Sequence, residues 1–407
     1  MYNLSTKFHG KILHKWRVVQ VTDFQSLMYP CFIFCYILGI FPYKINALTF
    51  KISKPRCMLS TVVICVTSVY SFILLHDIII SEKVTFGNLS WISSGTCYYI
   101  FTSFITIVTY ILSGPRMRLL QAIMDVSSKL PSKTYRKLSR LIYTKDIISF
   151  FLFIVITVLC FDKLNISLTL KLFTIYISLV EFQMNMLYFN CVCILKACFK
   201  RINDDLANLR EPVVNNAPHL FNRIYHKQRN LFLLMELKAL KKQHLMISDT
   251  VQMLNLVFSL QLLAFIAINF CDITFSLYFY ASKWSGFTNE LQEDLWYSYF
   301  LALIIYQSLK MSSIIWACET GKNQALEIGT TVHVVFNSIS DEDVKNELQL
   351  FSLQILQRKN IFSAKGLNVD ATLLAAIVGN ITTYLLILMQ FLLMSNSCNG
   401  KSTNNIT

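Results

Sequence analysis

Long apolar runs separated by charged segments dominate the pattern of hydrophobic and polar positions along the chain. A helix that crosses a bilayer needs about 20 mostly apolar residues, and seven runs in the 407 residues meet this requirement. These runs are residues 57–81, 87–113, 146–164, 168–195, 250–281, 295–318 and 369–395. The pattern therefore predicts an all-α membrane protein with seven transmembrane helices.

An eighth apolar stretch, LMYPCFIFCYILGIF at residues 27–41, precedes the first span. It is short for a full crossing, and Pro30 and Pro42 interrupt or end helical geometry there. We expect a short re-entrant or interfacial N-terminal helix within an N-terminal segment of residues 1–56.

Composition excludes a set of soluble domains. Hydrophobic residues make up 54% and charged residues 15% of the chain, and the mean hydropathy is +0.49, whereas soluble domains carry about 25% charged residues. No stretch is rich enough in glycine, serine or proline to be a linker. One continuous membrane domain is expected.

The distribution of lysine and arginine predicts the orientation, because cytoplasmic loops keep an excess of these residues. The segments before the first span and after the second, fourth and sixth spans hold 31 of the 37. We therefore expect a cytoplasmic N-terminus and an extracellular C-terminus. The net charge of +14 then faces the anionic lipid bilayer, and no nucleic-acid partner is implied.

Three of the five N-glycosylation sequons agree with this orientation, whereas those at Asn3 and Asn380 would be cytoplasmic and intramembrane. The three that agree begin at Asn88, Asn165 and Asn405, all on the expected extracellular side.

Three of the expected cytoplasmic segments are long: residues 114–145, 196–249 and 319–368. Their apolar residues recur at helical spacing with charges on the remaining face. We expect several spans to continue as helices into a shared cytoplasmic bundle. The alternative is loose amphipathic loops on the membrane surface.

Few intramembrane residues could carry chemistry. Ionisable residues inside the spans are few, among them Glu181 and Lys310, and no HExxH or GxSxG motif occurs in the spans. We expect no enzyme, cofactor or metal. Glu181 could contact a polar ligand or bond to a neighbouring helix, since intramembrane carboxylates face wet cavities or bundle interiors. Lys310 is expected to extend toward the cytoplasmic headgroups.

Aromatic and polar residues gather in the outer halves of the spans, where they could line a small-molecule pocket between helices. The candidates, with Glu181, are Tyr98, Tyr99, Tyr176, Asn269, Asp272, Trp296 and Tyr297. The alternative for each aromatic residue is the ordinary interfacial belt or core packing.

The last span carries a polar stripe. With about 100° per residue, six residues fall within about a third of the helix circumference. These are Asn380, Thr383, Tyr384, Ile387, Gln390 and Phe391. Such a face could line a narrow pore, with apolar rings as a gate, or could bond to adjacent helices. Thr382 lies outside the stripe and is assigned to packing.

Part of this stripe carries a family resemblance. Thr383, Tyr384, Gln390 and Phe391 match the TYxxxxxQF signature that ends insect gustatory receptors. GIFPY at residues 39–43, MLNLVFSLQLL at 253–263 and residues 366–370 extend the similarity over nearly the whole chain. The chain thus resembles that family of the insect chemoreceptor superfamily.

The resemblance implies a ligand-gated non-selective cation channel for small-molecule tastants in the plasma membrane of sensory neurons. It implies a homotetramer, or a heterotetramer with other gustatory receptors, through whose central pore cations permeate. Residues 57–318 would form the ligand-binding part, 319–368 the cytoplasmic anchor, 369–395 the pore helix and 396–407 an extracellular tail. Gln390 and Phe391 would form the gate, with Ile387 below them.

The ligand class is narrowed by one departure from the family pattern. In the sweet-sensing branch an acidic residue commonly follows the signature tyrosine, and this chain has Leu385 there. We expect bitter-type or other ligands outside that branch. The alternatives are a G-protein-coupled type of chemoreceptor or an odorant receptor of the same superfamily; a secondary transporter is disfavoured because internal repeats are absent.

Overall fold

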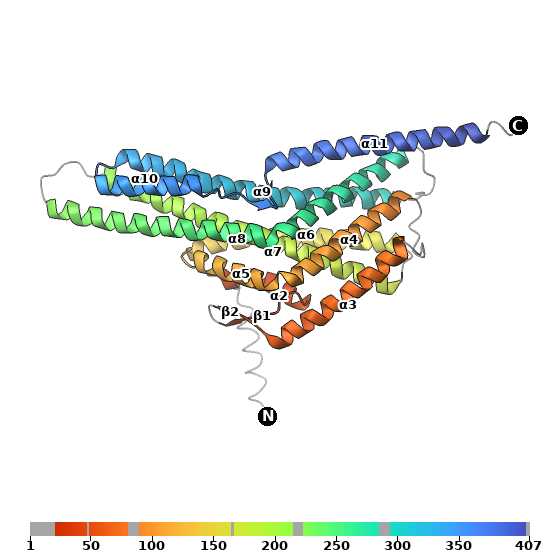
Figure 1. Cartoon of the computed structure of the whole chain (residues 1–407), viewed down its shortest axis with the longest axis horizontal. Helices are drawn as coiled ribbons and strands as arrows, with labels where there is room; N and C mark the ends of the chain where they lie inside the picture. Colours follow the sequence, from red (N-terminus) through yellow and green to blue (C-terminus); the bar gives the residue numbers. More distant parts are fainter. Residues whose placement is uncertain are drawn as a thin grey trace, which may run out of the picture.

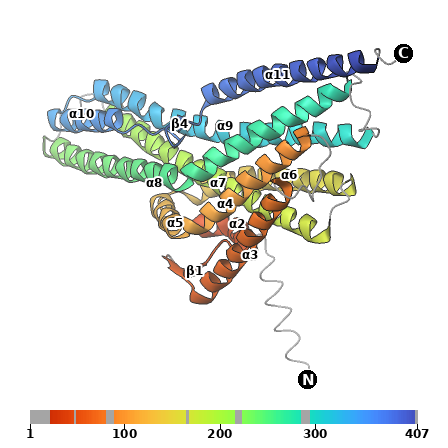
Figure 2. The same ribbon diagram turned by 45° about the vertical axis from the view of Figure 1, so that its right-hand side comes forward.

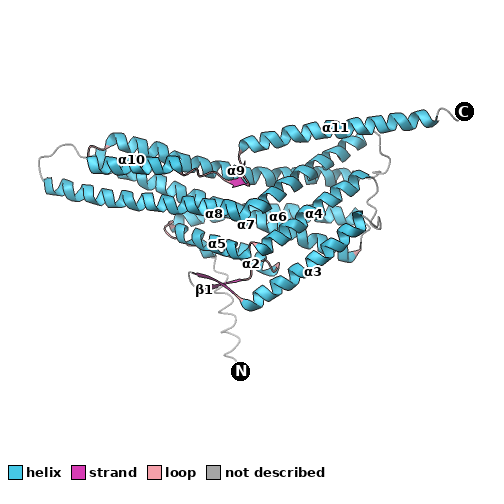
Figure 3. Ribbon diagram, in the orientation of Figure 1, coloured by secondary structure: helices cyan, strands magenta, loops and turns pink. Residues whose placement is uncertain are grey.

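The computed structural model describes residues 21–46, 49–79, 89–163, 167–214, 223–284 and 294–403, and these are almost entirely helical (Figures 1 and 3). The helices are α2 Phe24–Ile37, α3 Lys54–Ile79, α4 Leu89–Ile111, α5 Ser113–Ser127, α6 Ser132–Lys163, α7 Leu168–Val214, α8 Arg223–Trp284, α9 Asp294–Ser338, α10 Glu342–Gln357 and α11 Ala371–Thr403. Two antiparallel hairpins pair β1 Tyr43–Asn46 with β2 Thr49–Ile52, and β3 Ser363–Ala364 with β4 Leu367–Asn368.

Seven of the described helices are long and apolar enough to cross a membrane: α3, α4, α6, α7, α8, α9 and α11. The prediction of an all-α membrane protein with seven spans is therefore confirmed. The chain is a multi-pass membrane protein.

Three of these helices extend well beyond a bilayer crossing. Helices α7, α8 and α9 contain 47, 62 and 45 residues, whereas a crossing needs about 20. Their extensions lie beside α10 at one end of the molecule, and the C-terminus of α11 lies at the other (Figures 1 and 2). Gln354 of α10 donates to the Lys241 carbonyl of α8 at 3.0 Å, and Thr331 of α9 bonds to Asn203 of α7. The predicted helical continuation is confirmed, and the loose-loop alternative is wrong for these residues.

Helix α7 forms the centre of the protein. Every side chain from 180 to 195 is buried, and α7 contacts α2, α4, α5, α6, α8 and α9. Helices α3, α6 and α11 instead bury few of their apolar side chains. Apolar helix faces need either a protein core or lipid, so these three helices form the surface that faces lipid or neighbouring chains.

Helix α2 occupies the predicted short N-terminal position and is regular despite Pro30 in its interior. Because proline has no N–H, it leaves the carbonyl four residues earlier without its helical partner. The Tyr143 hydroxyl of α6 lies 3.1 Å from that carbonyl, on Ser26, and can donate to it. The 14 residues of α2 span about 21 Å at about 1.5 Å per residue, which is too short for a crossing.

Candidate functional site

Five spanning helices line a partly open cavity of about 200 Å³. Its wall is mostly apolar and aromatic, with a few polar groups, as is usual for small-molecule pockets. The lining residues come from α4 (Ser94, Gly95, Tyr98, Tyr99), α6 (Phe153, Ile156, Thr157, Cys160, Phe161), α7 (Thr174, Ile175, Ser178, Glu181), α8 (Ile268, Asp272) and α9 (Tyr299, Leu303, Tyr306, Gln307, Lys310).

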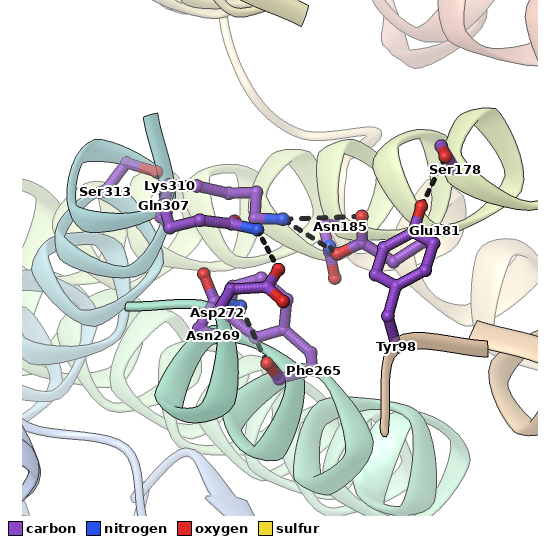
Figure 4. Close-up of polar contacts among 10 residues, drawn as sticks. All are labelled: Tyr98, Ser178, Glu181, Asn185, Phe265, Asn269, Asp272, Gln307, Lys310 and Ser313. Carbon is purple, nitrogen blue, oxygen red and sulfur yellow. Dashed lines mark hydrogen bonds and ion pairs between the residues drawn. The ribbon is translucent and has the colours of Figure 1, made fainter. Parts of the chain in front are cut away.

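A buried ion pair joins α7 to α9 in the wall of this cavity (Figure 4). The Lys310 Nζ lies 3.1 and 3.3 Å from the two carboxylate oxygens of Glu181, and each residue is only 6% exposed. The Asn185 amide also donates to Glu181. The expectation that Lys310 reaches the cytoplasmic headgroups is wrong, because a carboxylate at the same depth gives its ammonium group a partner inside the bundle.

A second carboxylate, Asp272 of α8, faces the same cavity. It accepts a hydrogen bond from the side-chain amide of Gln307 on α9 (Figure 4). The other side-chain atom of Gln307, Oε1, is buried and has no hydrogen-bond partner among the described residues. This part of the wall therefore presents acceptor groups.

Two tyrosines fix the α4 side of the cavity against α7. The Tyr98 hydroxyl bonds to Ser178, and the Tyr99 hydroxyl lies 3.0 Å from the Thr174 hydroxyl. Ser178 and Thr174 are one helical turn apart, so both tyrosines reach the same face of α7. Buried hydroxyl groups with partners of this kind rigidify a wall.

The predicted pocket residues divide into three groups. Tyr98, Tyr99, Glu181 and Asp272 line the cavity. Asn269 lies beside it, fully buried, and donates to the Phe265 carbonyl at 2.7 Å (Figure 4). Tyr176 does not line it; its hydroxyl donates to the Leu38 carbonyl after α2. The side chains of Trp296 and Tyr297 lie outside the described residues, as do the sequon residues Asn88, Asn165 and Asn405.

The sequence-based prediction missed Tyr306, Gln307 and Lys310. One signal was present: Glu181 and Lys310 carry opposite charges inside spans, and such residues pair with one another. Gln307 then follows, because it lies three residues before Lys310 on the same helix face.

A tight hairpin connects the α10 region to α11. Lys365 and Gly366, its two turn residues, have φ angles of 51° and 86°, and a two-residue turn with positive φ at both positions is of type I′. Asn255 of α8 donates to the Ile361 carbonyl at 2.7 Å and accepts from the Ser363 N–H at 3.1 Å. Ser259, one turn along, accepts from the Lys365 N–H at 2.7 Å. These residues belong to the MLNLVFSLQLL segment, so α8 holds the hairpin directly.

Helix α9 reaches the same junction. Gly321 packs against the Phe362 ring so closely that an added Cβ would lie 2.8 Å from it. Lys322 lies 3.6 Å from the Asp370 carboxylate, which also accepts from the N–H groups of Thr372 and Leu373 at the start of α11. The Thr372 hydroxyl, these backbone donors and Lys322 hold the pKa of Asp370 below its usual range. An ionised side chain therefore caps α11.

Helix α11 touches the rest of its own chain along a narrow line. Within residues 371–394 only Leu373, Ile377 and Ile381 are buried. All six stripe residues are exposed, including Phe391 at 67%. In the described part of the chain, neither Asn380 nor Gln390 bonds to another helix, and Thr383 bonds to the Gly379 carbonyl of α11 itself.

Two further side chains of α11 differ in their contacts. The Tyr384 ring meets Phe270 of α8 edge to face, with centroids 5.7 Å apart. Thr382, assigned to packing, is exposed and bonds to the Val378 carbonyl of α11. Thus Tyr384 has a partner on a neighbouring helix, whereas the rest of the stripe faces away from its own chain.

A family model described as 7tm chemosensory receptor matches residues 28–395. The chain is 32% identical over 165 residues to a Drosophila melanogaster protein named gustatory receptor 28b, covering 40% of this chain and 35% of that protein. It is 25% identical over 275 residues to gustatory receptor 28a of the same organism, covering 62% of this chain and 60% of that protein. These alignments thus span about a third and three fifths of the two relatives.

Solved structures share the fold. The insect olfactory receptor OR5 from Machilis hrabei aligns with a TM-score of 0.65 at 13% identity, over 90% of this chain and 98% of that chain. The same receptor in complex with eugenol aligns with a TM-score of 0.63 at 13% identity and equal coverage.

Proposed function

The chain belongs to the 7tm chemosensory receptor family, and from this premise we propose that it is a ligand-gated, non-selective cation channel for small-molecule tastants. One observation carries the proposal. Helices α8 and α9 both line the cavity and both hold the junction from which α11 starts. Ligand binding between these helices can therefore bias the position of α11, because rigid helices transmit small displacements.

The pore in this proposal is lined by the exposed stripe of α11, contributed by four copies of the chain or by this chain and related receptors. Exposed polar and apolar side chains on one face of a helix suit a water-filled path with an apolar gate. Gln390 and Phe391 form the gate, Ile387 lies below them, and Asn380 and Thr383 lie deeper. In this proposal the protein lies in the plasma membrane of a sensory cell. Its N-terminus and the bundle that α10 forms with the extensions of α7, α8 and α9 are cytoplasmic.

The ligands in this proposal are bitter-type or others outside the sweet-sensing branch, as Leu385 indicates. Eugenol in the Machilis receptor supports a small organic molecule as the kind of ligand that this fold accommodates.

The rival function is a G-protein-coupled chemoreceptor. We expect cells that express the chain to show a ligand-evoked cation current that persists when GDP-β-S in the recording pipette blocks G proteins, because the pore is within the protein. Whole-cell recording during application of a ligand panel measures this. Loss of the current under GDP-β-S, with a control channel unaffected, would favour the rival.

The bonds from Asn255 to the β3–β4 hairpin provide a test of whether ligand binding is coupled to α11 through this hairpin. Asn255→Leu removes the two bonds that Asn255 makes to the hairpin and leaves the Ser259 bond, and each lost bond leaves a backbone group whose burial costs about 1–3 kcal/mol. We expect the maximal ligand-evoked current to fall several-fold while the affinity for ligand, measured by binding to purified protein, stays within about twofold. Gln252→Leu is the matched control, because Gln252 is an exposed residue of α8 that bonds to Arg358 after α10 and not to the hairpin. An unchanged maximal current at equal surface expression would argue against coupling between the cavity and α11 through the Asn255 bonds.

A further inference from the structure

The polar wall of the cavity holds more acidic than basic groups. Among its lining residues are two carboxylates, Glu181 and Asp272, and one cation, Lys310. Both carboxylates are buried, at 6% and 8% exposure. Carboxylates at such depth need a cationic or hydrogen-bonding partner, because burying an unpaired charge is very costly.

The single cation is engaged by Glu181. Lys310 contacts both oxygens of that carboxylate, and Asn185 adds a third donor to it. Asp272 has one hydrogen bond in the described structure, from the uncharged amide of Gln307. Gln307 in turn keeps a buried Oε1 without a donor. Asp272 and Gln307 thus form an acceptor pair, from α8 and α9, that no cation of the described chain occupies.

Aromatic rings complete the surroundings of this acceptor pair. Tyr98, Tyr299 and Tyr306 line the same cavity. The faces of such rings attract cations, and Tyr306 already lies 5.1 Å from the Lys310 ammonium. The volume of about 200 Å³ is below the range of about 300–1,000 Å³ for drug-sized ligands, so it suits a molecule with one or two rings.

We propose that the ligand of this cavity is a small aromatic amine, whose protonated nitrogen is bound by the Asp272 carboxylate and the Gln307 Oε1 and whose ring packs among the tyrosines. This inference deepens the proposed function and rests on the cavity being its ligand site. Ligand binding would then join α8 to α9 through one ammonium group, on the two helices that reach the start of α11.

Matched amine and alcohol pairs test the inference. The probes are 2-phenylethylamine against 2-phenylethanol and tryptamine against tryptophol, which have nearly the same shape but differ in charge at neutral pH. Binding to the full-length protein purified in detergent is measured by ligand-induced thermal stabilisation, and currents are recorded from cells. We expect at least one amine to bind about tenfold or more tightly than its alcohol, because a hydrogen bond between charged groups is stronger than one from a neutral hydroxyl.

Variants identify the residues responsible. Asp272→Asn should weaken amine binding about tenfold or more and leave alcohol binding within about twofold. Gln307→Met serves as a second variant with a smaller effect in the same direction. Asp249→Asn removes a carboxylate from the same helix outside the cavity, where it pairs with Arg358, and should change neither affinity.

The outcomes separate this inference from the channel proposal. Amine binding that depends on Asp272 but evokes no current would overturn the channel and leave the amine site standing. Currents evoked equally by alcohols and amines, with Asp272→Asn without effect, would overturn the amine site and leave the channel standing. Absence of binding by either amine to the folded wild-type protein would also overturn the amine site.

Discussion

Lys310→Met is expected to lower the free energy of unfolding by about 3–5 kcal/mol, because it leaves the Glu181 carboxylate buried without its cation. The two side chains are only 4% and 8% exposed, so bulk water gives the carboxylate little of the stabilisation that the ammonium group supplied. Thermal unfolding of the purified protein in detergent, together with its yield at the cell surface, measures the effect.

A double variant should recover the stability that Lys310→Met loses. The double variant Glu181→Gln with Lys310→Met removes both charges and is expected to recover most of the loss, because only an unpaired buried charge is strongly destabilising. Lys242→Met, at an exposed position of α8, controls for loss of a lysine and should change stability by no more than about 0.5 kcal/mol. A Lys310→Met protein as stable as the wild type would show that the ion pair does not hold α7 to α9.

The membrane spans and their helical extensions were predictable because hydropathy and helical spacing are local properties of the chain. The seven apolar runs, and the amphipathic residues 196–249 and 319–368 beyond them, needed no knowledge of neighbours. Contacts between helices were less predictable, because they depend on which helices pack together. Lys310 could snorkel to the headgroups or pair with Glu181, and only the packing of α9 against α7 decides between the two.

The cavity was only partly predictable for the same reason. Tyr98 and Tyr176 are both tyrosines that we expected in outer halves of spans, yet Tyr98 lines the cavity and Tyr176 bonds to the end of α2. The position of each tyrosine within its own helix does not show which other helix packs against it. The hairpin bonds from Asn255 and Ser259 connect residues more than 100 positions apart, so the sequence showed the segment but not its role.

Phe391→Ala is expected to raise the ligand-independent cation conductance about threefold or more, because a smaller side chain weakens the apolar constriction that keeps water out of the closed pore. Phe391 is 67% exposed in its own chain, so its truncation leaves no cavity in the fold, and surface substitutions usually change stability by no more than about 0.5 kcal/mol. Normal surface expression should therefore accompany the leak.

The matched control is Leu393→Ala. Leu393 is also exposed, at 50%, and lies two residues further along α11, which places it about 200° around the helix from Phe391. It is therefore outside the stripe and should leave the basal current unchanged.

The most direct test of a pore lined by α11 is the basal cation current of Phe391→Ala relative to Leu393→Ala, recorded from whole cells and normalised to surface protein. A pore on the stripe face predicts a raised current in Phe391→Ala alone. Equal currents in the two variants and the wild type, at equal surface expression, would contradict it.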